Sequence, residues 1–348
     1  MEGKFGAFLS KSNIQEVNEM YYAGLDIHQK FIYATIKDKK GMIVRQMKVT
    51  SSMQGLDILF EGLPRNSISA VLESCGIWED IYNILEARCK FVCLANPLKT
   101  KAIASAKLKN DKVDSEVLAD LLRGNLVSTV YVPPKHIRDL RDIIRHRQGL
   151  IKIRTMLKNR VHGILRRKGI QPEFKDIFTV RGRQWLKRMK NPQIETYVKI
   201  IESLENEMKS LTEYKTEDKE LSKLIQNAET MDGIGKVARL VIASEIGDIK
   251  RFDNPKKLCS YAGLVPSQSQ SGDRDYRGRI TKQGSKWLRW ILIQCAHVAI
   301  KKPGKFQIYY YRLKKKKNHN VAITATARKM LYIMWNMLYY NRPYINNP

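Results

Sequence analysis

Long apolar runs are the first feature that this sequence lacks, because no stretch of about 18 or more residues is continuously apolar. A helix that spans a bilayer is therefore not expected. The stretch from Met1 to Met20 also lacks the apolar core of a secretory signal peptide. The five cysteines are odd in number and include no C-x-x-C pair, which argues against a disulfide framework or a zinc site. These absences indicate a cytoplasmic protein with reduced thiols and no membrane partner.

Acidic residues are also few, since 34 Asp and Glu stand against 63 Lys and Arg and give a formal charge of +29. Such an excess attracts polyanions, and nucleic acid is a better match than a membrane surface. Hydrophobic residues make up 43% of the 348 residues, which excludes a disordered chain. This length allows two or three domains and a sizeable core.

The N-terminal third predicts strands that alternate with helices. We expect residues 1–20 to be a weakly ordered extension. Short apolar or alternating stretches predict five strands, over residues 21–27, 31–36, 42–49, 68–72 and 91–95. Helices are expected from Ser51 or Ser52 to about Leu63 and from Ile77 to Ala87. Three strands in a meander, followed by a β-α-β-α alternation, are the order of an α/β ribonuclease H-like domain.

The stretch from Lys109 to Leu122 predicts the next helix, with Asn110 or Asp111 near its N-cap. Asp111 and Asp114 fall on the same side as its apolar stripe, and burying carboxylates is costly unless a cation offsets them. A divalent metal is the simplest explanation, because hard cations prefer carboxylate oxygen. The alternative is that both are N-terminal acids favoured by the helix dipole.

Two further acids stand at expected strand ends, Asp26 in the first strand and Glu73 after the fourth. With Asp111 and Asp114 they form a set of four carboxylates from three elements, all expected at one edge of the sheet. Such a set suits one or two Mg²⁺ ions, about 3.5–4 Å apart, that clamp a scissile phosphate. The alternative is that Asp26 and Glu73 are ordinary acids at loop edges.

Pro133 and Pro134 are expected to end this domain, and a long basic helix over residues 135–168 follows. We favour contacts of this helix with nucleic-acid phosphates over a solvated face, because of the charge of the whole chain. Apolar residues are expected along its other side at Ile137, Leu140, Ile144, Ile151, Met156, Leu157, Val161, Ile164 and Leu165. The candidate phosphate contacts are Arg154, Lys158 and Arg160.

A heptad pattern follows, with apolar residues spaced alternately by three and four. Its positions are Ile194, Tyr197, Ile201, Leu204, Met208 and Leu211. This seam is expected to pack either against the 135–168 helix of the same chain or against a second chain.

The last third is predicted to be mostly helical. Gly233-Ile234-Gly235, ahead of a helix over residues 237–246, is similar to a helix-hairpin-helix turn that binds phosphate, or else is a plain glycine turn. Further helices are expected over 286–300 and 322–340, with Trp287 and Trp290 in the core. Between them and the turn lies a polar loop, residues 267–272, with three serines and no neighbouring His that would complete a triad. A basic segment with Arg274, Arg277 and Arg279 comes next.

Two sets of motifs resemble those of the insertion sequence 110 family of transposases, over residues 21 to about 340. One set is similar to that family's DEDD motif and consists of Gly24-Leu25-Asp26-Ile27-His28-Gln29-Lys30, Glu73-Ser74-Cys75-Gly76 and Lys112-Val113-Asp114. The other set is similar to its C-terminal transposase domain and consists of Gly263-Leu264-Val265-Pro266, Gln270-Ser271-Gly272, residues 278–284 and Leu288-Arg289. Ser74-Cys75, where small residues or Thr are common in the family, and the longer N-terminus depart from its pattern.

The resemblance implies a RuvC-like DEDD domain over residues 21–132, a helical coiled-coil middle over 133–228, and a mostly α C-terminal transposase domain over 229–348. It implies Mg²⁺ held by Asp26, Glu73, Asp111 and Asp114, and a nucleophilic serine at Ser271. The partners implied are an element-encoded bridge RNA with donor and target DNA. Because strand exchange needs more than one active site, we favour pairing of chains through the heptad seam, as a homodimer or tetramer.

The function expected on this basis is an RNA-guided DNA transposase or recombinase that forms a covalent phosphoserine intermediate. It would work in a prokaryotic cytoplasm, associated with the nucleoid during the reaction. Arg274, Arg277 and Arg279 are expected to stabilise the phosphate-bound state. The alternatives are a RuvC-like nuclease that uses metal-activated water and a non-catalytic protein that packages nucleic acid.

Overall fold

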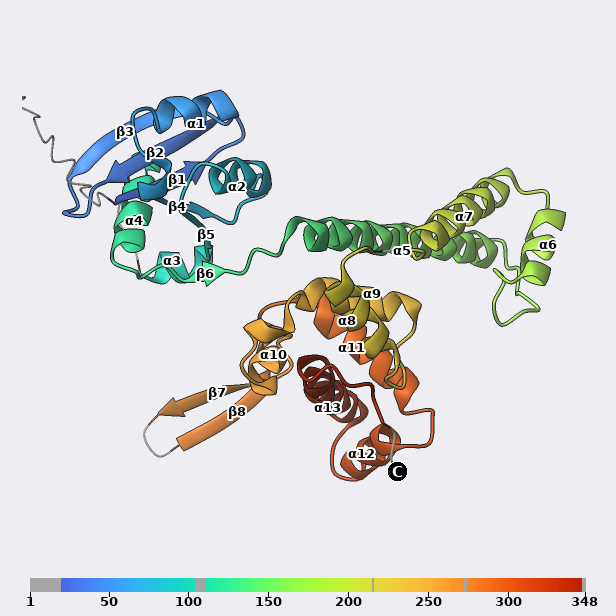
Figure 1. Cartoon of the computed structure of the whole chain (residues 1–348). Helices are drawn as coiled ribbons and strands as arrows, with labels where there is room; N and C mark the ends of the chain where they lie inside the picture. The colour runs from blue at the N-terminus through green and yellow to red at the C-terminus, as the bar shows by residue number, and fades with distance from the viewer. Residues whose placement is uncertain (1–19, 104–109, 215, 272–273, 346–348) are drawn as a thin grey trace, which may run out of the picture. The chain divides into compact units, whose positions relative to one another are not determined.

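The computed structural model describes residues 20–103, 110–214, 216–271 and 274–345, so nearly all of the expected N-terminal extension lies outside the described residues. The chain divides into two compact units, Met1–Val132 and Pro133–Pro348. Figure 1 shows the strands of the first unit and the helices of the second. Among the described helices, none combines the length and the apolar character needed to cross a membrane.

The first unit contains a mixed six-stranded sheet in the order β3-β2-β1-β4-β5-β6. Strands β1, β2 and β3 form an antiparallel meander, and β4 and β5 continue the sheet parallel to β1. This arrangement confirms the five predicted strands and the meander. Strand β6, which pairs antiparallel with β5, was not expected. The bounds are β1 Tyr21–Ile27, β2 Phe31–Lys37, β3 Ile43–Thr50, β4 Ile68–Glu73, β5 Phe91–Ala95 and β6 Thr129–Val130.

Helices cover both faces of this sheet. Ala23 and Leu25 of β1 pack in one core with α1 (Met53–Leu59) and α2 (Trp78–Glu86). On the other face, α4 (Asp111–Arg123) packs on β1, β2 and β4. Ser52 caps α1 as predicted, but the helix ends at Leu59 instead of about Leu63, and Gly62 then turns the chain with a positive φ of 75°. The short α3 (Pro97–Ile103) was not predicted.

Gly24 of β1 is the point at which α4 lies closest to the sheet. A Cβ at this position would lie 2.1 Å from the backbone oxygen of Ser115 and 2.4 Å from the backbone nitrogen of Ala119. Both atoms belong to the helix backbone and cannot move aside alone. The absence of a side chain at Gly24 therefore sets the distance between α4 and β1.

Replacing Gly24 by Ala should consequently destabilise the first unit. Overpacking of this kind typically costs about 1–3 kcal/mol, and backbone contacts place this site at the upper end. Urea denaturation followed by circular dichroism would measure the shift in midpoint. Gly76→Ala is the matched control, because a Cβ at Gly76 meets nothing within 4 Å. Equal midpoints for the two variants would contradict the close approach of α4.

The second unit is mostly helical, with one β-hairpin. Its helices are α5 Lys135–Arg167, α6 Val180–Arg188, α7 Pro192–Ser210, α8 Lys219–Glu229, α9 Lys236–Ile246, α10 Pro255–Tyr261, α11 Lys286–Ala299, α12 Lys305–Lys314 and α13 His319–Tyr339. The hairpin strands are β7 Pro266–Ser271 and β8 Arg274–Ile280. Helices α6, α8, α10 and α12 were not predicted, whereas the long helix expected over 135–168 is confirmed as α5.

The heptad seam of α7 packs within the chain. Ile194 and Ile201 are buried in one cluster with Leu157 and Val161 of α5. The structure thus shows the alternative in which α7 closes on the helix of its own chain, to which residues 168–191 with the short α6 connect it. Pairing between chains through this seam was our favoured expectation, and it stays a prediction. Met156 was expected on the apolar side of α5 but is 46% exposed.

The polar loop expected over residues 267–272 is instead mostly a strand. Residues up to Ser271 form β7, which pairs antiparallel with β8 and matches Ser271 to Arg274. The alternating Ser and Gln residues hid this strand, because strand prediction depends on alternating apolar residues. The base of the hairpin is anchored at Gly284, whose φ is 78° and where a Cβ would lie 2.1 Å from the backbone oxygen of Tyr261.

Candidate active site

Asp26 and Glu73 lie at the carboxyl ends of two neighbouring parallel strands. Leu25 of β1 lies opposite Leu72 of β4, and Asp26 and Glu73 are the next residues of the two strands. Side chains two residues apart on a strand share a face. Asp26 therefore faces the same side as Gly24, which is the side covered by α4. Glu73 ends β4 and is half-buried.

The first turn of α4 supplies the other two acids. Asn110 is its N-cap, as predicted, and its side chain accepts a hydrogen bond from the backbone nitrogen of Lys112. Asp111 and Asp114 follow in that first turn. Close contact of α4 with β1 at Gly24 brings this end of the helix to the edge where Asp26 lies.

Asp26 and Asp111 converge, and a histidine that was not predicted as a site residue joins them. Ligand atoms of Asp26, His28 and Asp111 all lie within 4.8 Å of one another. Among the described residues, Glu73 and Asp114 are not part of this group of mutually close ligand atoms. The sequence Asp26-Ile27-His28 could have indicated His28 as a site residue, because residues two apart at a strand end lie on the same side.

Burial and neighbouring carboxylates disfavour the ionised form of Asp26. Burial raises the pKa of Asp26, the charge and hydrogen bond of His28 lower it, and the charges of Asp111 and Asp114 raise it, with a net increase. Asp114 therefore acts on Asp26 although it lies outside the closest group. Half-buried carboxylates that repel one another are a donor set that fits a divalent cation.

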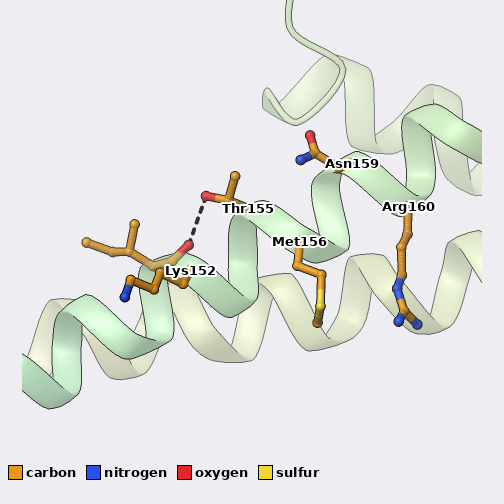
Figure 2. A pocket seen from close by; sticks show the side chains of 6 residues that line it. Lys152, Thr155, Met156, Asn159 and Arg160 are labelled. Atoms are coloured by element: carbon orange, nitrogen blue, oxygen red, sulfur yellow. Dashed lines mark hydrogen bonds between the residues drawn. The ribbon is translucent and has the colours of Figure 1, made fainter.

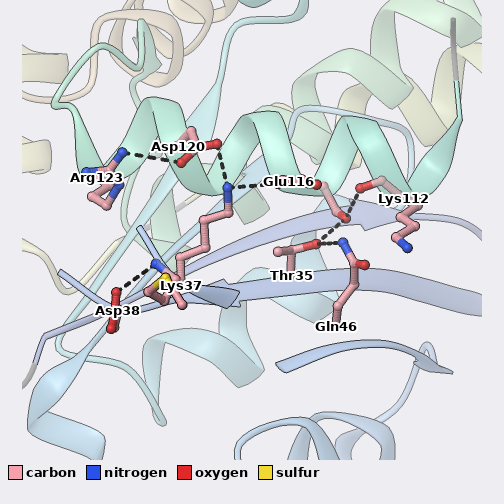
Figure 3. Close-up of polar contacts among 10 residues, drawn as sticks. Thr35, Lys37, Asp38, Gln46, Lys112, Glu116, Asp120 and Arg123 are labelled. Atoms are coloured by element: carbon pink, nitrogen blue, oxygen red, sulfur yellow. Dashed lines mark hydrogen bonds and ion pairs between the residues drawn. The ribbon is translucent and has the colours of Figure 1, made fainter. Parts of the chain in front are cut away.

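Helix α4 is locked onto β2 by buried polar contacts, shown in Figure 3. Lys37, whose side chain is 6% exposed, donates to Glu116 at 2.9 Å and to Asp120 at 2.6 Å. Burial lowers the pKa of Lys37, but hydrogen bonds and charges from Asp120 and Glu116 outweigh burial and raise it. Thr35 and Ser115 share a buried hydrogen bond of 2.8 Å. Glu116 and Asp120 thus hold the helix in place and do not face Asp26.

The three cations predicted to bind phosphates on α5 differ in their surroundings. Arg154 and Lys158 lie 3.6 and 3.8 Å from Glu205 of α7, so both also take part in packing of the two helices. Arg160 is exposed and donates to Tyr197 at 3.4 Å. A shallow, open pocket of about 600 Å³ is lined by Ile151, Lys152, Thr155, Met156, Asn159 and Arg160. Figure 2 shows the side chains of the last five along α5.

The candidate serine lies on the hairpin of the second unit. The backbone of Ser271 ends β7 and pairs with Arg274 of β8. The side chains of Ser271, Arg274 and Arg277 lie outside the described residues, and Arg279 is exposed near the base of the hairpin. Ser267 faces Gly278 across the hairpin, where a Cβ would lie 2.4 Å from its hydroxyl oxygen.

The glycine turn was expected either to bind phosphate or to be a plain turn. Gly233 has a φ of 88°, and a Cβ there would lie 2.5 Å from the backbone oxygen of Cys295, so packing on α11 requires a glycine. Phosphate binding by this turn stays a prediction.

Trp287 packs partly against the core, with Lys152 Nζ 5.7 Å from its ring centroid. Trp290 was expected in the core, but it is 38% exposed.

Comparison with known proteins finds two matching family models, the first of which extends from the first unit over α5. A transposase family model of the DEDD, IS110 type matches residues 23–169, and a model described as the transposase IS116/IS110/IS902 family matches residues 225–311. The first match implies a ribonuclease H-like fold, which agrees with the mixed sheet and its helices, and it suggests the use of a divalent metal.

Individual relatives are distant but extend over most of the chain. The putative transposase y4qE of Sinorhizobium fredii is 25% identical over 232 residues, which are 67% of this chain and 58% of that protein. The transposase for insertion sequence element IS1111A of Coxiella burnetii is 26% identical over 286 residues, 77% of each chain. A pilin gene-inverting protein of Moraxella bovis is 26% identical over 291 residues, 80% of this chain and 82% of that protein.

Proposed function

We propose that this chain, which both domain matches and its relatives support as an IS110-family transposase, recombines DNA under the guidance of an RNA. In this proposal, carboxylates of the first unit would hold a divalent metal, and Ser271 would form a covalent phosphoserine link. The observation that carries its metal-dependent step is the convergence of Asp26 and Asp111 at one edge of the sheet. Insertion and inversion of DNA both require broken strands to be rejoined, and a covalent link preserves the energy of the broken bond.

The acids Asp26, Glu73, Asp111 and Asp114 would hold the metal, for which we propose Mg²⁺. When bound, such a metal polarises the phosphate and offsets the negative charge that develops during displacement. The chain's own contribution is to fix the carboxylates. Gly24 admits α4 to the sheet, and the ion pairs of Lys37 hold that helix in position.

Ser271 would supply the nucleophile. Its hydroxyl oxygen forms a bond to phosphorus while the bond between phosphorus and the leaving strand's oxygen breaks, and the leaving strand departs with a hydroxyl end. A hydroxyl end of the second strand then attacks the phosphoserine, which frees the serine and joins the strands. Arg274, Arg277 and Arg279, on the paired strand β8, would stabilise the charge on the phosphate.

Charge supports a nucleic-acid partner, for which we propose a bridge RNA together with donor and target DNA. From Tyr276 to Pro348 the sequence contains no Asp or Glu. Exposed apolar side chains at Ile153 and Met156 of α5 support self-association as a homodimer or tetramer, although the α7 seam is covered within the chain. We place the reaction in a prokaryotic cytoplasm, on the nucleoid.

A reconstituted reaction tests this function. Purified protein is incubated with divalent metal, DNA that carries the ends of the element, target DNA and RNA transcribed from the flank of the reading frame. Recombinant junctions that require both the metal and the RNA would support the proposal. Junctions that form equally well without RNA would contradict RNA guidance while leaving the recombinase intact.

A nuclease that uses activated water is the second candidate. It is favoured by one observation, namely that the carboxylate group lies within the first unit and needs no residue from the hairpin. Such an enzyme would release DNA strands with free ends and no protein attached. Denaturing gels of the reconstituted reaction separate the two candidates, since only the recombinase leaves a protein–DNA adduct.

Nucleic-acid affinity should depend on salt through the cations of α5. Replacing Arg154, Lys158 and Arg160 by Gln should reduce the slope of log affinity against log salt by roughly 0.7–0.9 for each phosphate that is no longer neutralised. Replacing the exposed Lys199, Lys209 and Lys219 by Gln removes the same charge from α7 and α8 and serves as the control. Filter binding at several salt concentrations measures both slopes. Equal slopes would show that the α5 cations form a solvated face.

A further inference from the structure

His28 lies directly after β1, and its imidazole contacts two of the carboxylates described above. Its Nε2 lies 3.2 Å from Oδ2 of Asp26 and 3.4 Å from Oδ2 of Asp111. One ring nitrogen carries at most one proton, so a neutral imidazole cannot satisfy both oxygens with full hydrogen bonds. One nitrogen and two carboxylate oxygens directed toward one another match the donor arrangement of a transition-metal site.

Contacts to the ring and to the backbone of His28 hold this imidazole in place. The ring stacks on Phe31 with centroids 4.5 Å apart and planes inclined by 28°. Nζ of Lys48 lies 3.6 Å from the Phe31 ring centroid. The backbone is held as well, because the His28 nitrogen donates to Phe31 O at 2.8 Å and the Ser51 hydroxyl donates to His28 O at 2.6 Å. A histidine fixed in this way is pre-organised to bind a ligand through Nε2.

We propose that His28 binds the metal together with Asp26 and Asp111 and shifts the preference of the site from Mg²⁺ toward Mn²⁺. This inference rests on the metal site of the proposed function. Mg²⁺ takes oxygen ligands in a strict octahedron, and an imidazole nitrogen is a poor replacement for one of them. Mn²⁺ shares the preference of Mg²⁺ for carboxylate and water, and it stands within the first-row series that binds mixed nitrogen and oxygen sites.

Pulsed electron paramagnetic resonance of the full-length protein loaded with Mn²⁺ alone tests the ligand directly. A directly bound imidazole couples its ¹⁴N nucleus to the Mn²⁺ electron spin and modulates the echo. We expect this modulation in the wild-type protein and in a His146→Ala control, which removes an exposed histidine of α5. The His28→Ala variant should lose the modulation and still bind Mn²⁺ through its carboxylates.

The wild-type spectrum alone distinguishes failure of this inference from failure of the metal site. Bound Mn²⁺ without nitrogen modulation would overturn the role of His28 and leave the carboxylate site standing. Absence of bound Mn²⁺, with identical spectra for wild type and Asp26→Asn, would overturn the metal site itself and the inference with it. Neither outcome depends on whether the His28 variant folds.

Titration calorimetry with Mn²⁺ and Mg²⁺ measures the shift in preference. His28→Ala should weaken Mn²⁺ binding by at least the roughly 10-fold that loss of an outer-sphere partner causes. Its affinity for Mg²⁺ should change little. His28→Asn offers an amide oxygen instead of the nitrogen and should not restore the preference for Mn²⁺. A ratio of the two affinities that is the same in wild type and both variants would contradict the proposal.

Discussion

Replacing Asp26 by Asn is expected to abolish DNA strand cleavage while leaving nucleic-acid binding nearly intact. Bound metal contributes several kcal/mol to stabilising the transition state of phosphate displacement, so losing it slows the reaction on the order of 10³-fold or more. Asn has the same shape but carries no charge, and Asp26 is only half-buried, so the fold should persist. Affinity for DNA should stay constant or rise slightly, because a negative charge near the phosphate is removed.

The measurement is a single-turnover cleavage assay on labelled DNA, with binding determined separately by gel shift. Asp114→Asn should behave like Asp26→Asn, since the charge of Asp114 reaches Asp26, whose pKa it raises. Asp57→Asn is the matched control, because Asp57 lies on α1, on the opposite face of the sheet, and pairs with Arg88. Full cleavage by the Asp26 variant in the presence of metal would overturn the assignment of the carboxylates.

Replacing Ser271 by Ala should stop recombination and remove every covalent protein–DNA adduct. A recombinase of this kind needs the hydroxyl as nucleophile, whereas a nuclease that activates water needs only the metal and its carboxylates. Ser271 lies at the end of β7, away from the hairpin base where Gly284 packs on α10. Folding and RNA binding should consequently remain normal in the variant.

Ser267→Ala is the matched control, because the same side chain is changed on the same strand, but near the base of the hairpin. Its hydroxyl faces Gly278, and the strand register shifts at this point, so we expect a minor effect on activity. Ser269→Ala should also be mild, and Ser271→Cys is expected to keep at most a trace of activity through its thiolate. Reactions on labelled DNA are quenched in denaturant and examined for a protein-linked band. Recombinant product from the Ser271→Ala protein would make the water-activating nuclease the better explanation.

The two assays test different units of the chain. Asp26 belongs to the first unit and Ser271 to the second, and each was assigned from a separate motif. A loss of cleavage in both variants, with normal binding in both, would show that the two units act in one reaction. Loss in the Asp26 variant alone would leave the first unit as a self-sufficient nuclease.

The sequence by itself determined the features that depend on neighbouring residues. Short apolar or alternating stretches predicted β1 to β5, and pairs of candidate caps that included Ser52 and Asn110 predicted the starts of α1 and α4. The acids at strand ends and in the first turn of a helix could be placed because these elements had been predicted. The excess of basic residues follows from the composition. These signals are local, because strand period and helix caps involve residues a few positions apart. The motif resemblance added the family, which the comparisons support.

Only the tertiary structure decided which side chains meet, because that depends on register and on packing between distant segments. His28 joins Asp26 and Asp111 only when α4 lies against β1, and the missing side chain of Gly24 permits that approach. The side chain of Lys37 is buried because α4 packs on β2 and supplies Glu116 and Asp120 as its partners. The seam of α7 had two possible partners, and a helix of the same chain, held nearby by a short connection, covers it here. The Ser271 strand has no apolar period, so its pairing with β8 became visible only in the fold.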